Sequence, residues 1–243
     1  KDDVQHVAGL IYAGSAIAAV FAGDMVSLFT YWELTAISSV FLIWARRTER
    51  SFRCGLRYLI LQVGSGVILL SGLLVRYSET GSLAFGQMSL DEGLGAQLVF
   101  LSFGIKAAFP LLHTWLPDAY PEGTPSGSVF LSTFTTKLAI FALLRCFAGT
   151  EELIWIGLAM TIFPLLFALV VDDLRRGLAY ALNNQLGFMV VGVGLGSELA
   201  LAGVAAHAFC HILYKSLLFM SLGAVLQQAG TACASGLGGL RRA

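Results

Sequence analysis

The chain has 243 residues, of which 57% are hydrophobic and only 12% are charged. Soluble domains carry about 25% charged residues, so this composition indicates a polytopic membrane protein and excludes a soluble globular domain. The formal net charge is zero, which gives no reason to expect a nucleic-acid partner. The four cysteines, Cys54, Cys146, Cys210 and Cys233, lack CxxC or metal-binding spacing, and we interpret them as apolar fillers.

Apolar segments long enough to cross a bilayer recur along the chain. A hydrocarbon core of about 30 Å requires about 20 apolar residues in a helix. Eight segments fit, with loose boundaries: Val7–Ala22, Met25–Ala45, Tyr58–Val75, Ala96–Leu116, Ser126–Phe147, Leu153–Val171, Leu178–Leu195 and Leu199–Leu226. The sequence therefore predicts an all-α bundle forming one transmembrane domain, residues 1–243. Because the chain begins without Met and ends in a Gly- and Ala-rich stretch, we expect a piece of a longer protein.

The basic residues predict how the bundle is oriented. With eight spans, one side receives nine arginines: Arg46, Arg47, Arg50, Arg53, Arg57, Arg175, Arg176, Arg241 and Arg242. The opposite side receives Lys1, Arg76, Arg145 and the acidic residues Glu79, Asp91, Glu92, Glu151, Glu152 and Glu198. Cytoplasmic loops carry an excess of Lys and Arg. We therefore expect a multi-pass protein of a bacterial inner (plasma) membrane, with the loops at Arg46–Arg57 and Arg175–Arg176 in the cytoplasm.

Glu33 is a carboxylate near the middle of the second segment. Alone it would take up a proton, whereas a nearby lysine would let it stay ionised. Two interpretations are open. Glu33 forms a structural ion pair between helices, or it belongs to a pair whose spacing controls when the lysine holds its proton.

Lys106 places a charge in the middle of the fourth segment. A charge at the bilayer centre costs about 2.5–3.5 kcal/mol on insertion scales, so a compensating group is expected. Pro110 follows four residues later and has no N–H, so the Lys106 carbonyl loses its helical partner. We expect a broken helix near Lys106–Leu116, and a buried lysine beside such a break is a candidate ion or proton site.

Lys137 follows a run of Ser and Thr residues in the fifth segment, with Thr133 one turn earlier on the same helix face. Hydroxyl groups beside a buried lysine can hold water. Small Ser and Thr side chains also let neighbouring helices approach closely. Both interpretations are compatible with the sequence.

His207, His211 and Lys215 are spaced i, i+4 and i+8, so they share one helix face over roughly 12 Å. Imidazole exchanges protons near neutral pH, which makes this line a candidate proton path. One alternative is a pair of structural histidines with a snorkelling lysine. The other is a metal site, which the pattern disfavours because the Glu of HExxH and a third ligand are missing. We expect no bound metal.

These residues lie in segments that resemble the antiporter-type subunits. That family comprises the D and A subunits of Mrp Na⁺/H⁺ antiporters and the homologous membrane-arm subunits of respiratory complex I and membrane-bound hydrogenases. The similar segments are Tyr31–Thr35, Gly104–Ala119, Thr136–Arg145, Asp173–Tyr180, Gln185–Met189 and His207–Phe219. The lysine motif ending in HTWLPDA is highly specific. The sequences around Trp32 and Glu122 are similar to those of D-type Mrp subunits. The chain departs from the family at Pro121–Pro125, where the family often has Ala-Pro-Thr-Pro.

The resemblance implies a fold of about fourteen helices with two inverted repeats, each containing one broken helix. Residues 1–148 would form the first repeat and residues 152–243 the start of the second. The second broken helix, with its ionisable residue, would follow Ala243. By motif, the proton relay would consist of Glu33 as partner glutamate, Lys106 on the broken helix, Lys137 as bridging lysine, and His207, His211 and Lys215 as central axis.

The sequence thus predicts a proton-translocating subunit of a multisubunit monovalent cation (Na⁺)/H⁺ antiporter, a transporter subunit and not an enzyme. It predicts no cofactor, since it has no cysteine cluster, GxGxxG or haem motif. The expected partners are other membrane subunits and the lipid bilayer, and the expected transported ions are protons with or without Na⁺. Asp24, at the mouth of the second segment, stands alone and offers no cage of carboxylates for Na⁺.

Three alternatives are open from the sequence. The first is a proton-pumping membrane-arm subunit of a complex I-like NADH:quinone oxidoreductase or of a hydrogenase. The second is an assembly subunit without an ion path, which the retained intramembrane charges disfavour. The third is an intramembrane metallohydrolase at His207 and His211, which would require bound zinc.

Overall fold

The computed structural model describes residues 3–237, which form ten α-helices and three short 3₁₀ helices. The α-helices are α1 (Asp3–Val20), α2 (Met25–Trp44), α3 (Glu49–Thr80), α4 (Leu94–Ala107), α5 (Trp115–Ala119), α6 (Pro125–Thr133), α7 (Thr135–Cys146), α8 (Glu152–Val170), α9 (Leu174–Leu195) and α10 (Glu198–Ala229). The 3₁₀ helices are η1 (Leu90–Glu92), η2 (Tyr120–Glu122) and η3 (Ala234–Gly236). Each predicted apolar segment coincides with helical structure, which confirms the all-α prediction.

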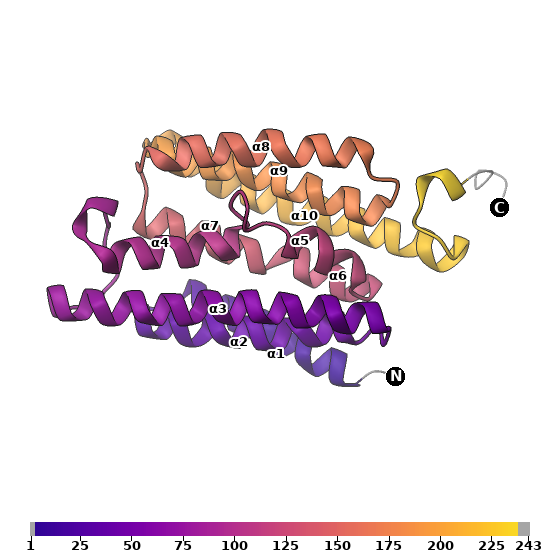
Figure 1. Ribbon diagram of the computed structural model, residues 1–243, viewed down its shortest axis with the longest axis horizontal. Helices are drawn as coiled ribbons and strands as arrows, with labels where there is room; N and C mark the ends of the chain where they lie inside the picture. Colours follow the sequence, from indigo (N-terminus) through magenta and orange to yellow (C-terminus); the bar gives the residue numbers. More distant parts are fainter. Residues whose placement is uncertain (1–2, 238–243) are drawn as a thin grey trace.

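The helices run along the long axis of the molecule in three tiers (Figure 1). Helices α1, α2 and α3 pack on one another at one side, and α8, α9 and α10 pack together at the other. The shorter helices α4, α5, α6 and α7 fill the space between them. Helix α1 begins and helix α10 ends at the same end of the bundle.

Within the described residues, six helical segments are long and apolar enough to cross a membrane: α2, α3, the α6–α7 pair, α8, α9 and α10. The two remaining predicted spans correspond to α1 and to the α4–α5 pair, so the count of eight crossings stays a prediction. Side chains such as Leu169, Val170, Leu199 and Phe209 on α8 and α10 point outward. Apolar outer faces of this kind suit contact with lipid or with further transmembrane helices.

Helix α3 begins at Glu49, well before the predicted start of the third span. The reason is a capping box, in which the Thr48 hydroxyl accepts the Ser51 N–H at 3.0 Å and the Ser51 hydroxyl accepts the Thr48 N–H at 3.1 Å. The expectation that Arg50, Arg53 and Arg57 lie in a loop is therefore wrong, because all three lie on the first turns of α3.

The arginine-rich segments meet at one end of the bundle around two carboxylates. The ion pairs are Arg46–Glu122 at 3.2 Å, Arg50–Glu122 at 2.8 Å, Arg57–Asp118 at 2.7 Å and Arg176–Asp118 at 3.7 Å. Both carboxylates follow the predicted helix break, so these pairs connect the α2–α3 corner and the start of α9 to that segment. Residues 1, 241 and 242, which also entered the orientation argument, lie outside the described residues.

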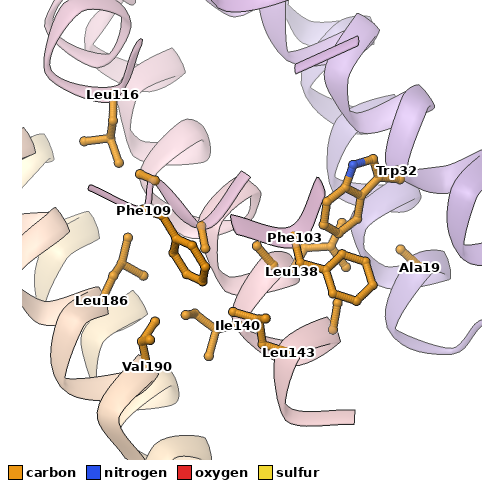
Figure 2. Packing of buried hydrophobic residues seen from close by; sticks show 14 of the residues in the cluster. Ala19, Trp32, Phe103, Phe109, Leu116, Leu138, Ile140, Leu143, Leu186 and Val190 are labelled. Carbon is orange, nitrogen blue, oxygen red and sulfur yellow. The ribbon is translucent and has the colours of Figure 1, made fainter. Parts of the chain in front are cut away.

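Buried apolar side chains form a continuous core through all three tiers. Trp32 of α2 packs against Phe103 of α4 with ring centroids 5.2 Å apart. Figure 2 shows Phe109, from the segment after α4, beside Ile140 of α7 and facing Leu186 and Val190 of α9. This packing holds the end of α4, which carries Lys106, between the other helices.

Asp24 caps the N-terminus of α2. Its Oδ1 accepts the N–H groups of Val26 at 2.9 Å and Ser27 at 2.8 Å, and its Oδ2 accepts the Ser27 hydroxyl at 2.7 Å. Because these donors, led by the Ser27 N–H, bond the ionised carboxylate, the pKa of Asp24 lies below its ordinary value. The ionised Asp24 cap therefore stabilises the fold at pH values above the pKa that Asp24 has in the unfolded chain. This stabilisation is lost as the pH falls through the pKa of Asp24 in the folded protein.

We predict that Asp24→Ala destabilises the protein by about 1 kcal/mol at pH 7, the usual cost of losing such a cap. Asp24→Asn retains a capping oxygen and should cost less, but it should weaken the dependence of stability on acid pH. Thermal unfolding of the purified protein in detergent at neutral and acid pH measures both effects. Equal stability of the wild type and Asp24→Ala at pH 7 would show that the cap contributes nothing.

Candidate functional site

Lys106 is completely buried at the end of α4, and α2 supplies the groups that bind its ammonium. The Lys106 Nζ donates to the Trp32 carbonyl at 2.9 Å and to the Thr35 hydroxyl at 3.1 Å. It also lies 4.1 Å from the centroid of the Trp32 ring, in a cation–π contact. Hydrogen bonds from a charged group contribute about 1.5–3 kcal/mol each, which is comparable with the insertion cost of about 2.5–3.5 kcal/mol. Helix α2 can therefore hold this charge without a direct ion pair.

The predicted break after Lys106 is present, but it begins before Pro110. Helix α4 ends at Ala107, and Ala108 adopts the left-handed conformation with φ 63°. Because a residue that precedes proline is disfavoured in the helical conformation, the turn has to start before Phe109. A left-handed alanine is strained, and residues of this kind concentrate at functional sites.

The break frees backbone groups inside the bundle. The Phe109 N–H reaches back to the Gly104 carbonyl at 3.0 Å, and the Trp115 indole donates to the Ile105 carbonyl at 3.1 Å. Irregular backbone at membrane depth is tolerated only where protein or water satisfies it. Trp115 therefore holds the two parts of the broken helix together across the gap.

Glu33 lies one residue after Trp32 and is half-buried, with its carboxylate over Gly66 of α3. A Cβ at residue 66 would lie 1.3 Å from the Glu33 Oε1. Within the described part of the chain this oxygen is buried and has no hydrogen-bond partner. The charges of Glu33 and Lys106 interact electrostatically, although the two side chains do not touch as an ion pair.

Lys137 lies beside a kink that divides the fifth predicted span into α6 and α7 at Phe134. The Lys137 Nζ donates to the Ser132 carbonyl, which precedes the kink. The Thr133 hydroxyl was expected on the same face as Lys137, and its side-chain partner is Ser216 of α10 at 3.1 Å. The continuous helix expected here is therefore interrupted, and the lysine binds backbone at the interruption.

His207, His211 and Lys215 all lie on α10, one helical turn apart, as their spacing predicts. The His207 and His211 ring centroids are 6.1 Å apart, and His207 Nε2 lies 3.1 Å from Oε1 of Gln185 on α9. His211 is completely buried, and within the described residues neither of its ring nitrogens has a hydrogen-bond partner. Lys215 is also buried, so it does not snorkel to the surface.

The structure brings the six predicted residues together in two groups. The first is the Glu33–Lys106 pair between α2, α3 and α4. In the second, Lys137 near the start of α7 interacts electrostatically with His207, His211 and Lys215 of α10, a helix that packs against α6 and α9. The lysines Lys106 and Lys137 do not contact each other.

Sequence reasoning missed a set of buried hydroxyl groups between these two groups. They are Tyr12 on α1, Ser39 on α2, Tyr58 on α3 and Thr135 at the start of α7. Thr135 belongs to the run of Ser and Thr residues already noted before Lys137, whereas Tyr12, Ser39 and Tyr58 were given no role. It also missed Gln185, whose motif resembles the family but was given no role.

No metal site is formed within residues 3–237, where no group of three or more His, Cys, Asp and Glu side chains is placed to bind an ion. Asp24, considered as a carboxylate for Na⁺, uses both oxygens to cap α2.

The profile of the NADH:quinone oxidoreductase/Mrp antiporter transmembrane family matches residues 22–243. The chain belongs to this family. It is 30% identical to the D subunit of the Na⁺/H⁺ antiporter of Alkalihalophilus pseudofirmus over 91% of its own length and 49% of that protein. It is 28% identical to hydrogenase-4 component B of Escherichia coli over 91% of its own length and 37% of that protein.

Among solved structures, the Mrp complex from Dietzia sp. contains a chain with the same fold. The TM-score is 0.81 at 26% identity, over 89% of this chain and 44% of the other. The chain thus spans less than half the length of each of these three proteins. The resemblance to antiporter-type subunits and the membrane-spanning fold are confirmed.

The position of Glu33 over Gly66 gives a test that does not depend on activity. Gly64→Ala, on the same helix with open space around it, should stabilise by up to about 1 kcal/mol because Ala favours helix. Gly66→Ala should instead destabilise, because the Glu33 carboxylate must move. In a Glu33→Ala background the two glycine substitutions should behave alike in thermal unfolding. If they still differ there, Glu33 is not the group that lies over Gly66.

Proposed function

We propose that this chain is part of the proton-translocating subunit of a multisubunit monovalent cation (Na⁺)/H⁺ antiporter, of the D type found in Mrp complexes. One observation carries the proposal: the interior of a bundle with few charges contains two groups of ionisable residues. They are Glu33 with Lys106, and Lys137 with His207, His211 and Lys215 of α10. Ionisable residues inside a membrane are expensive and mark ion or proton pathways. The 30% identity to the D subunit of an Na⁺/H⁺ antiporter supports this assignment.

The mechanism follows from how the groups are placed. Protons enter along His207, His211 and Lys215 of α10 and reach Lys137, with which these residues interact electrostatically. Lys137 and Lys106 then exchange protons through the interior. An approaching carboxylate favours a protonated amine, so movement of Glu33 toward Lys106 favours proton uptake and movement away favours release.

A redox-driven proton pump is the second candidate, supported by the 28% identity to hydrogenase-4 component B. The same residues would act in the membrane arm of a complex I-like oxidoreductase or a hydrogenase. The neighbouring genes discriminate between the two. Genes for small Mrp-like subunits support the antiporter, and genes for quinone-binding and iron–sulfur subunits support the pump.

The arrangement in the membrane is also part of the proposal. The Arg-rich end, which includes Arg46, Arg50, Arg57 and Arg176, lies in the cytoplasm of a bacterium, following the excess of basic residues there. Residues 1–148 form the first inverted repeat, and residues 152–243 begin the second. Other membrane subunits of the complex flank this chain.

We predict that Lys106→Ala and Lys137→Ala, each made in the complete subunit within its assembled complex, lower proton transport about tenfold or more, since a tenfold effect needs only about 1.4 kcal/mol. Arg53→Ala is the control, because Arg53 is exposed and pairs with Glu49 on the helix surface. Transport is measured by the pH change inside membrane vesicles, and native gels check assembly. Undiminished transport in Lys106→Ala would overturn the proposal and favour an assembly subunit.

A further inference from the structure

Four buried hydroxyl groups from four helices lie next to one another in the core and form a chain of neighbouring oxygens. The Ser39 hydroxyl lies 2.7 Å from the Tyr58 hydroxyl. The Tyr58 hydroxyl lies 3.5 Å from the Thr135 Oγ1, which is longer than an ordinary O–H···O hydrogen bond and has to shorten for a proton to pass. The Thr135 hydroxyl is hydrogen-bonded to that of Tyr12. The chain crosses four helices, α2, α3, α7 and α1, and so runs across the bundle from one helix to the next.

The hydroxyl chain is shielded from the surroundings. Tyr12, Tyr58 and Ser39 are completely buried and Thr135 is 2% exposed. Two further hydroxyls border it, those of Tyr120 and Thr136, and both are buried without a hydrogen-bond partner in the described residues. Burying an unsatisfied hydroxyl costs about 1–3 kcal/mol. A bundle that needed only packing would place Phe and Val at these positions.

One end of the hydroxyl chain lies next to Lys106. The Lys106 Nζ donates to the Thr35 hydroxyl at 3.1 Å. Thr35 and Ser39 stand at i and i+4 on α2, so their side chains are neighbours on one face of that helix. A single water molecule spans such a separation and can pass a proton.

The other end lies at the helix interruption, where Thr135 is two residues before Lys137 in the sequence. The interruption at Phe134 leaves the Thr135 N–H free of the helix, and it donates to the Tyr12 hydroxyl at 2.9 Å. On the opposite side of the same kink, the Lys137 Nζ donates to the Ser132 carbonyl. Tyr12 and Lys137 therefore bind the two sides of one helix interruption. Thr136, whose buried hydroxyl has no hydrogen-bond partner in the described residues, lies between Thr135 and Lys137 in the sequence.

We propose that Ser39, Tyr58, Thr135 and Tyr12 carry protons between Lys106 and Lys137, an inference that rests on the proposed function. The Lys106 ammonium releases a proton toward Ser39. Each hydroxyl oxygen accepts a proton on one side and gives up its own on the other, and the Lys137 amine takes the last one. Lys106 ends neutral, Lys137 ends as an ammonium, and no hydroxyl keeps a charge. The reverse transfer requires each O–H to rotate back.

The decisive variant is Tyr58→Phe, which removes one oxygen and keeps the ring that packs on Trp115. In the complete subunit within its assembled complex, it should slow proton transport about fivefold or more, a change of about 1 kcal/mol in the barrier. Tyr77→Phe is the matched control, because Tyr77 lies on the same helix and is 53% exposed. Unchanged transport in Tyr58→Phe, with transport lost in Lys106→Ala, would overturn the hydroxyl chain alone.

A second pair of variants separates proton transfer from a structural role. Thr135→Ser keeps the hydroxyl and should retain most of the transport rate, whereas Thr135→Val keeps the shape and should lose it. The ratio of rates in H₂O and D₂O should also rise in Tyr58→Phe as transfer becomes limiting. Equal losses in Thr135→Ser and Thr135→Val would assign Thr135 to packing and overturn the inference. Undiminished transport in both lysine variants would overturn the proposed function, and the inference with it.

Discussion

The burial of the Lys106 ammonium in an apolar bundle is the constraint on which much of this structure depends. Its charge is held by the carbonyl, the ring and the neighbouring hydroxyl that α2 presents, from Trp32 and Thr35. Helix α4 ends directly after the lysine, where Ala108 adopts the left-handed conformation. The nearby Glu33 then acts at a distance, so its influence on the lysine can change without the lysine losing its primary contacts.

Both lysines of the middle tier lie at helix interruptions, but they are bound in different ways. Lys106 donates to a carbonyl and a hydroxyl of the regular helix α2, whereas Lys137 donates to a carbonyl at its own interruption. An interruption also exposes carbonyl and N–H groups that must find partners. At the first break the Trp115 indole binds a freed carbonyl. At the second, Lys137 binds one side of the kink and Tyr12 the other. Only at the second interruption does a freed carbonyl hold the lysine itself, because Lys106 is held by α2.

Polar groups of the interior are concentrated in the middle tier and on the helix faces that meet it, while α8 and α10 present apolar side chains outward. The ion pairs of Glu122 and Asp118 close one end of the bundle around the segment after the break. Ion pairs whose arginines reach the solvent contribute little to stability. Their effect here is to connect the α2–α3 corner and α9 to the broken helix.

The sequence by itself determined the membrane class, the helical segments and the six ionisable residues, because hydropathy and the cost of a buried charge act locally along the chain. The periodic spacing also placed His207, His211 and Lys215 on one face, since a single helix decides it. The tertiary structure decided the rest. The interruption at Phe134 involves a partner far away in sequence, because the freed Thr135 N–H donates to Tyr12. The meeting of Ser39, Tyr58, Thr135 and Tyr12 depends on how four helices pack, and no local pattern encodes which hydroxyls will touch.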